Sequence, residues 1–232
     1  MDSLLLDVTI KGTLVLLATG GAAFALRRAP AATRHVVWTV GMAGALALPL
    51  LSKLLPGWTV AVLPAQVPTA AGLPVGAAAG NGTRVEATLA LVWLAGMAVV
   101  LASIALGRLR IWWIARRSAP IDRGEIPALT TALCGALGIS RRVSVRLCPD
   151  RMMPMVWGAV RPVILLPAEA TGWSAELKRD VLLHELAHVR RHDYLNQLVT
   201  RFACAVHWFN PLAWRAARRV WAERERACDD HV

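Results

Sequence analysis

Long apolar runs separated by short arginine-rich segments fill the first half of the chain. Three of these runs reach the roughly 20 residues that a helix needs to cross a bilayer, and they cover residues 4–26, 36–55 and 87–106. Asp7 and Lys11 interrupt the first run, but they lie four residues apart on a helix and can pair near the outer interface.

A secretory signal peptide is the alternative interpretation of the first run. Such a peptide begins with basic residues, whereas Asp2 and Asp7 occupy that region here. We therefore expect three transmembrane helices, with a loop over residues 56–85 between the second and the third.

Shorter segments with mixed periodicity follow in the second half. A helical pattern over residues 126–137 ends at Gly138, and another helix is expected over residues 175–191, with Ser174 as its capping residue. Alternating or continuous apolar patterns predict strands, and these cover residues 143–147, 155–157 and 163–166. The sequence therefore predicts a small β-sheet among helices.

The C-terminal region contains two further helical segments. Residues 194–209 are apolar with scattered polar positions, which favours a partly buried or interfacial helix over a clean span. Asn210 and Pro211 form a strong helix start, and no later Pro or Gly interrupts the helix up to about Asp230. We expect a mainly helical membrane protein with a transmembrane region over residues 1–107 and an α+β domain over residues 108–232.

Composition and charge placement agree with a membrane protein of defined orientation. Hydrophobic residues make up 56% of the chain and the mean hydropathy is +0.48, high for a soluble domain. Basic residues lie between the first two runs and after the third, whereas the loop carries only Arg84; the flanking arginines are Arg27, Arg28, Arg34, Arg108, Arg110, Arg116 and Arg117. The positive-inside rule places the loop outside and the second half in the cytoplasm.

The net charge of +11 also raises the question of nucleic-acid binding. Many arginines flank apolar runs, however, and a further basic cluster near the C-terminus lies close to Trp214 and Trp221. This combination suits the anionic inner leaflet, with an ordinary solvated helix face as the alternative. The lipid bilayer is therefore the expected partner, and no direct contact with nucleic acid is expected.

His184-Glu185-Leu186-Ala187-His188 is the strongest chemical motif in the chain. The two histidines are four residues apart, so both rings can reach one metal ion from the same helix face. Glu185 lies one position on from His184, where its carboxylate can reach a metal-bound water and act as the catalytic base. This pattern is typical of zinc peptidases, and a solvated helix face with two histidines is the alternative.

A catalytic zinc needs a third protein ligand and one open position. His192 is too far along a continuous helix, about 12 Å from His184, and no glycine allows a chain reversal between them. Glu225 and Asp229 share a face of the last helix, so one can bind zinc while the other hydrogen-bonds a ligand histidine. An ordinary charged helix face is equally compatible with this spacing.

These motifs resemble the BlaR/MecR family of membrane zinc peptidases. The resemblance rests on three segments in the family's order, namely residues 154–167, the stretch from His184 to Asp193, and Trp208 to Leu212 followed by Glu225 to Asp230. It implies a gluzincin-like domain in which Zn²⁺ is bound by His184, His188 and Glu225, with Glu185 as the base and Asp229 as the acidic partner. It also implies a multi-pass protein of the bacterial inner membrane with its peptidase domain facing the cytoplasm.

The resemblance implies proteolysis in signal transduction, of the kind that regulates antibiotic resistance. The expected substrate is a cytoplasmic regulatory protein such as a transcriptional repressor, or the chain itself, and a homodimer is a further expectation. The alternative is a receptor or scaffold with a structural zinc site, which the intact Glu185 disfavours because a structural site needs no base. One of the predicted strands is expected to pair with the substrate, and His207 and Arg191 are candidates for stabilising the oxyanion.

Overall fold

The three predicted spans are confirmed as long helices in the computed structural model, which describes residues 2–54, 79–149 and 152–229. They are α1 (Asp2–Ala25), α2 (Ala31–Leu54) and α3 (Ala79–Arg117). Each is long and apolar enough to cross a membrane, over Leu5–Ala25, Ala31–Ser52 and Arg84–Arg117. The predicted loop over residues 56–85 lies mostly outside the described residues, and its last seven positions belong to α3 instead.

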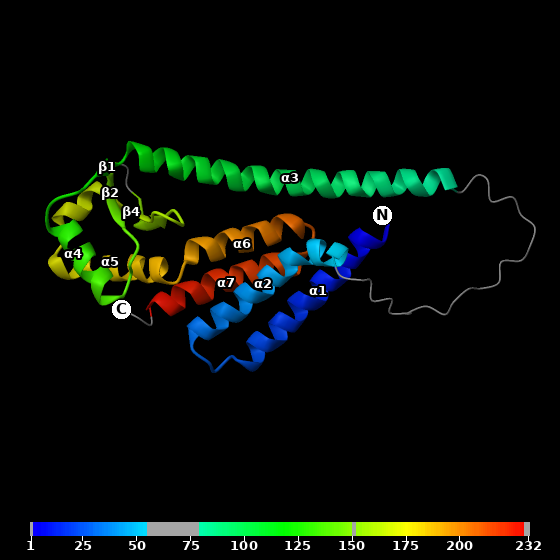
Figure 1. Ribbon diagram of the computed structural model, residues 1–232, viewed down its shortest axis with the longest axis horizontal. Coiled ribbons are helices and arrows are strands. Elements are labelled where there is room, and N and C mark those ends of the chain that lie inside the picture. The colour runs from blue at the N-terminus through cyan, green and yellow to red at the C-terminus, as the bar shows by residue number, and fades with distance from the viewer. Residues whose placement is uncertain (1, 55–78, 150–151, 230–232) are drawn as a thin grey trace, which may run out of the picture.

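A helical hairpin from the C-terminal half packs against these membrane helices. It consists of α6 (Asp193–Val206) and α7 (Pro211–Asp229), which run alongside α2 and α1 (Figure 1). Small and apolar residues fill the shared core; the buried ones are Leu16, Met42, Ala45, Ala203, Cys204, Ala213, Ala216 and Val220. The partly buried helix predicted over residues 194–209 is therefore confirmed in character, and its partners are the membrane helices themselves.

Polar contacts fix the tip of this hairpin. The fully buried His207 ring has Nε2 3.0 Å from the carbonyl oxygen of Ala45, and Asn210 Nδ2 donates to Thr13 Oγ1 at 3.0 Å. Gly12 makes room for the imidazole, because a β-carbon there would lie 2.5 Å from His207 Cε1. A buried polar group in a membrane environment needs such a partner, so these contacts fix the depth of the hairpin.

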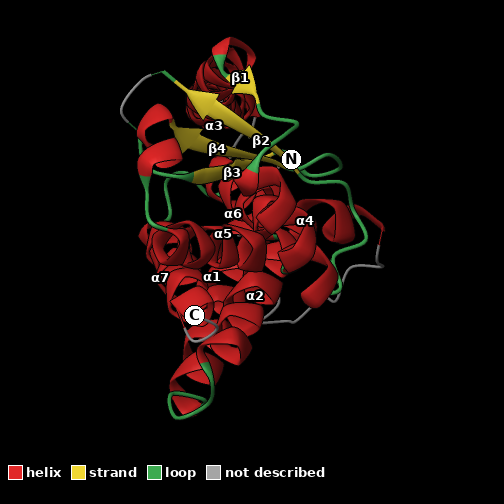
Figure 2. Ribbon diagram, turned by 90° about the vertical axis from the view of Figure 1, so that its left-hand side faces the viewer, coloured by secondary structure: helices red, strands yellow, loops and turns green. Residues whose placement is uncertain are grey.

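The remaining elements form the predicted small sheet with its helices. They are β1 (Ala119–Pro120), α4 (Glu125–Ala136), β2 (Ser144–Cys148), β3 (Met155–Trp157), β4 (Val163–Pro167), the 3-10 helix η1 (Ala168–Gly172) and α5 (Ala175–Arg190). The strand order is β1-β2-β4-β3, with β2 and β4 parallel and the other pairs antiparallel. Figure 2 shows the strands gathered near the top of the molecule, with α3 beside β1 and most of the other helices below the sheet.

A second core joins this sheet to the helices below it. Val145, Ile164 and Leu166 point from β2 and β4 towards Leu182 and Leu186 of α5, and all five side chains are buried. The pattern of burial explains why the strand runs were recognisable in sequence, since apolar residues recur on the covered face. The sheet edge formed by β3 is the one that lies nearest α5 and the site described below. The expected division at residue 107 stays a prediction, although α3 crosses that position without a break.

Candidate metal centre

Helix α5 presents the two histidines of the motif on one side and its apolar residues on the other. Its start is fixed as the sequence predicts, because Ser174 Oγ accepts a hydrogen bond from the backbone N–H of Leu177 at 3.2 Å. Leu182 and Leu186 are buried against the sheet. The opposite face therefore turns His184 and His188 towards α7, with their ring centroids 4.9 Å apart.

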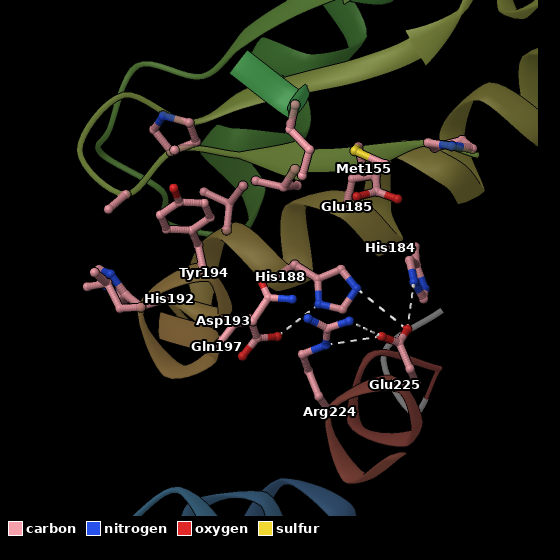
Figure 3. Close-up of a pocket in the computed structure, with 18 of the residues that line it drawn as sticks. Met155, His184, Glu185, His188, His192, Asp193, Tyr194, Gln197, Arg224 and Glu225 are labelled. Carbon is pink, nitrogen blue, oxygen red and sulfur yellow. Dashed lines mark hydrogen bonds and ion pairs between the residues drawn. The ribbon is translucent and has the colours of Figure 1, made fainter. Parts of the chain in front are cut away.

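Helix α7 delivers Glu225 to these imidazoles. The helix begins at Pro211, and Asn210 Oδ1 accepts a hydrogen bond from the N–H of Leu212 at 2.9 Å, as a capping residue does. Fourteen residues further on, Glu225 Oε2 lies 3.7 Å from His184 Nε2 and 3.8 Å from His188 Nε2. The structure thus brings together three side chains that the sequence proposed as ligands (Figure 3).

The spacing of these three groups fits a tetrahedral metal ion. One donor atom from each side chain lies within 4.8 Å of the other two. Bonds of about 2.0–2.1 Å at tetrahedral angles put neighbouring ligand atoms about 3.3 Å apart, so the two carboxylate–imidazole separations of 3.7 and 3.8 Å need to close by about half an ångström or less. Imidazole nitrogen and carboxylate oxygen are donors that zinc accepts.

Arg224 orients the carboxylate of Glu225. Its Nε donates to Glu225 Oε1 at 3.0 Å, and its Nη2 contacts the same oxygen. This leaves Oε2 as the oxygen that faces both imidazoles. This contact between Arg224 and Glu225 could not be predicted from the sequence, because the side chains of adjacent helical residues rarely meet.

Asp193 orients the ring of His188. The sequence pattern predicts such a contact to a ligand histidine from the last helix, where Asp229 lies, and not from Asp193. Its Oδ2 lies 2.8 Å from His188 Nδ1, and the side chain of Asp193 is almost fully buried. In the neutral ring, a hydrogen bond from Nδ1–H to the carboxylate leaves Nε2, on the side of Glu225, as the unprotonated nitrogen that a metal ion needs. Asp229 lies at the other histidine, with Oδ1 3.6 Å from His184 Nδ1, and its side chain is 70% exposed.

A chain reversal at His192 brings Asp193 into this position. The helix ends at Arg190, and His192 adopts a left-handed backbone conformation with φ 57°, so the chain turns without a glycine. The continuous helix assumed in excluding His192 is therefore wrong. Among the described residues, two groups of side chains could hold a metal ion, and His192 belongs to neither. They are His184, His188 and Glu225, and His188, Asp193 and Cys228.

The two oxyanion candidates lie elsewhere. His207 is at the buried tip of the α6–α7 hairpin, with its ring next to Ala45 and Gly12. Arg191 donates to the backbone oxygen of Arg224 at 3.2 Å and so connects the end of α5 to α7. Neither residue lines the cavity at the metal centre, so both expectations are wrong.

Burial and neighbouring groups shift two pKa values in the site. Burial raises the pKa of Glu185 to about 7, and the negative charge of Glu225 adds to the increase while His188 opposes it. Burial lowers the pKa of His188, but its hydrogen bonds to Asp193 and Cys228 more than offset this and raise the value to about 9. A carboxyl group poised near neutral pH is suited to accepting and releasing a proton.

A cavity of about 610 Å³ opens beside these groups. Its walls come from α3, β3, α5, α6 and α7, and they include Ile111, Met155, Val156, Tyr194 and Trp221. Figure 3 shows Glu185 and Met155 on one side of the two imidazoles and Glu225 on the other. The mainly apolar walls and the few convergent polar groups are typical of a substrate-binding cleft.

Comparison with known proteins places the chain in a family. The sequence model of the family described as BlaR1 peptidase M56 matches residues 3–232. The regulatory protein BlaR1 of Bacillus licheniformis is 30% identical over 152 residues, which are 64% of this chain and 25% of that protein. The methicillin resistance mecR1 proteins of Staphylococcus aureus and Staphylococcus epidermidis are 35% identical over 81 residues, which are 34% of this chain and 14% of each relative. The chain therefore spans a quarter or less of these relatives, yet the family match covers nearly all of it, and it belongs to the BlaR1 peptidase M56 family.

Proposed function

We propose that this chain is a membrane zinc endopeptidase. The observation that supports the proposal most strongly is the convergence of His184, His188 and Glu225 beside a buried Glu185 at the edge of a cavity. The three spans and the family of peptidases to which the chain belongs agree with it. We infer that His184, His188 and Glu225 are the zinc ligands and that Asp229 supports His184.

The chemistry divides between the metal and the protein. Bound zinc would polarise the scissile carbonyl and lower the pKa of water at its open position. Glu185 accepts the proton from the attacking water and then delivers it to the leaving nitrogen. In the metal-free protein, burial already raises the pKa of this carboxyl group to about 7, far above that of an exposed glutamate. Asp193 and Arg224 keep His188 and Glu225 in the orientation that binding requires.

The edge strand β3 is the proposed docking place for the substrate backbone. It pairs with β4 on one side only, and Met155 and Val156 line the cavity next to the metal centre. An extended peptide can add to such an edge through backbone hydrogen bonds, which give affinity without demanding one sequence. Scission then depends mainly on whether a segment can extend across the cleft.

We further infer that the peptidase region faces the cytoplasm. Arg27 and Arg28 lie between α1 and α2, Arg34 lies in the first turn of α2, and further arginines follow the apolar part of α3. The positive-inside rule then places the metal centre at the inner edge of the bacterial cytoplasmic membrane. The proposed substrate is a cytoplasmic regulatory protein, such as a repressor, or the chain itself, in line with relatives named for regulation and methicillin resistance.

Separate variants of the ligand and the base test this proposal. Glu185→Gln in the purified chain, reconstituted in nanodiscs, should keep about one zinc ion but lose at least about 100-fold in cleavage of itself and of quenched peptides. Glu225→Gln should lose the ion as well. Glu176→Gln, an exposed residue in the first turn of the same helix, is the matched control and should match wild type.

Two results would contradict the assignment. Cleavage by Glu185→Gln at the wild-type rate would remove Glu185 from the mechanism. Stoichiometric zinc without cleavage by any form of the protein would favour the receptor or scaffold with a structural site. Metal content by mass spectrometry and product formation by gel and fluorescence separate these cases.

A further inference from the structure

A second cavity lies between α1, α2 and α7, away from the metal centre. Its volume is about 720 Å³. One part of its lining is apolar and includes Leu17, Phe24 and Trp38, and the other part is strongly basic. Leu17 and Phe24 are 54% and 67% exposed, so the apolar wall is open to the surroundings of the helices.

The basic part carries more positive charge than its own carboxylate can balance. Five arginines line it together with one acid, Glu223; they are Arg27, Arg34, Arg215, Arg219 and Arg226. Both oxygens of Glu223 are already engaged, Oε2 with Arg34 Nη2 at 2.7 Å and Oε1 with Arg226 Nη1 at 2.9 Å. Four positive charges of the five are therefore left over inside one cavity.

Arg215 and Arg219 are the residues that need a partner from outside the protein. They lie four residues apart on α7 and are both exposed. Neither has an ion-pair partner among the residues that the structure describes. Arg27, which also lines the cavity, stacks on Phe24, with its Cζ 4.8 Å from the centroid of the ring.

The position of these arginines relative to α1 suggests which anion they meet. Along α7 they lie between Asn210, which contacts Thr13 in the middle of α1, and Glu223, which pairs with Arg34 at the start of α2. They are thus beside the half of the first span that leads to the arginine-rich turn between α1 and α2 (Figure 1). Arginine is costly at this depth unless it reaches the interface or an anionic group.

We propose that this cavity binds the headgroup of an anionic phospholipid of the inner leaflet, with an acyl chain along the exposed apolar wall of α1. The phosphodiester supplies the negative charge that Arg215 and Arg219 lack, while Leu17 and Phe24 contact the chain. Basic pockets between membrane helices on the cytoplasmic side are known to recognise such lipids. Free phosphate would satisfy the arginines but would leave the apolar wall unused.

Native mass spectrometry of the full chain tests this site without any need for peptidase activity. The protein in detergent is titrated with phosphatidylglycerol or with phosphatidylcholine of the same acyl chains. Phosphatidylglycerol should bind tighter to the wild type. Each arginine near an anionic headgroup contributes about a factor of five, so the double substitution Arg215→Gln with Arg219→Gln should weaken this binding about 25-fold.

A matched double variant provides the control. Arg110→Gln with Arg218→Gln removes the same charge from two exposed arginines that do not line this cavity, and its lipid binding should equal that of the wild type. Equal affinity of the wild type for both lipids would overturn the proposal without reference to any variant. Equal losses in the two double variants, or displacement of phosphatidylglycerol by millimolar inorganic phosphate, would also overturn it.

Discussion

The α1–α2 pair and helix α3 contact the α6–α7 hairpin from different sides and in different ways. The pair contributes Leu16, Met42 and Ala45 to a common buried core and fixes the hairpin tip by polar contacts. Over the apolar window of α3, in contrast, none of the residues is buried within the structure. Helix α3 runs beside α6 and contacts it (Figure 1).

Two of the contacts of α3 involve aromatic side chains. Near its middle, Trp93 Nε1 donates to the oxygen of Val206 at 3.0 Å, and Trp208 Nε1 donates back to the oxygen of Trp93 at 3.1 Å. Nearer its C-terminal end, Arg108 lies over the ring of Tyr194, with Cζ 4.3 Å from the centroid. Since Tyr194 lines the cleft, the least packed span is also the one that forms part of the wall of the site.

The largest effect is expected where α1 has no room to adjust. In Gly12→Val the new β-carbon would lie 2.5 Å from the fully buried ring of His207, and the side chain is larger still. We expect a loss of more than about 3 kcal/mol in the free energy of unfolding, because a close-packed core cannot absorb the volume. Thermal unfolding in detergent measures it.

Gly21→Val is the matched control for this substitution. It places the same side chain on the same helix, where nothing lies within 4 Å of the added β-carbon. If both variants unfold at the same temperature, the packing of α1 against the hairpin is not what stabilises the protein. The conclusion that the hairpin packs more tightly against the α1–α2 pair than against α3 would then be wrong.

Raising the pH should lower the stability of the metal-free protein through the titration of two groups in the site. In the metal-free protein, the pKa of Glu185 is raised from 4.5 to about 7 and that of His188 from 6.5 to about 9. Groups with raised pKa values stabilise the folded state below their unfolded values and lose this effect as the pH rises through their folded values. Stability should therefore fall between about pH 4.5 and pH 9, by several kcal/mol in all.

Zinc should reverse this trend. Binding requires neutral His188, so the stabilisation that added zinc gives should grow as the pH rises through about 9. Unfolding curves recorded at pH 6 and pH 9, with zinc and with a chelator, measure how the stability of the zinc-bound and of the metal-free protein depends on pH. A metal-free protein that is more stable at pH 9 than at pH 6 would contradict the proposed pairing of His188 with Asp193.

The same kind of substitution, glycine to valine, should have a smaller effect on stability in α3 than in α1. In Gly96→Val the added β-carbon would lie 2.1 Å from Trp208 Cε2, closer than in the α1 case. Because α3 buries little surface, we expect it to move away from α6 at a cost of about 1–2 kcal/mol. Spin labels on the exposed Leu14 and Leu91 should report the larger separation, and Gly107→Val, with nothing within 4 Å, should not change it.

How far the sequence predicts this molecule depends on the range of the interactions concerned. Helix starts at Ser174 and Asn210, the three spans and the strands follow from local patterns, and all of them are confirmed. Convergence of Glu225 with the two histidines followed from resemblance, since helical spacing alone left a charged face equally acceptable.

The errors arise where tertiary contacts override a local pattern. His192 turns the chain in a left-handed conformation although it is not a glycine, and this places Asp193 against His188. The polar His207 looked available for catalysis, but a distant glycine in α1 provides the space in which it is buried. The first contact depends on a turn without glycine and the second joins residues far apart in sequence, and no periodicity within one segment encodes either.

The smallest predicted effect concerns Arg108 and rests on the proposed peptidase activity. Its guanidinium contacts Tyr194 and lies 5.7 Å from the ring centroid of Trp157, the last residue of the edge strand β3. Losing two such contacts in Arg108→Ala should lower kcat/KM about three- to tenfold, mostly through KM, because β3 becomes less well ordered for an incoming strand. Arg108→Lys should restore part of this loss, since an ammonium group also interacts with aromatic rings.

Arg110→Ala is the control for that measurement, because it removes an exposed arginine two residues along the same helix. If it lowers kcat/KM as much as Arg108→Ala does, the loss reflects charge near the cleft and α3 has no specific contact with the edge strand. If only Arg108→Ala acts, the weakly packed helix α3 has a specific contact with the edge strand β3. A displacement of that helix would then change substrate binding without disturbing the core shared by α1, α2 and the hairpin.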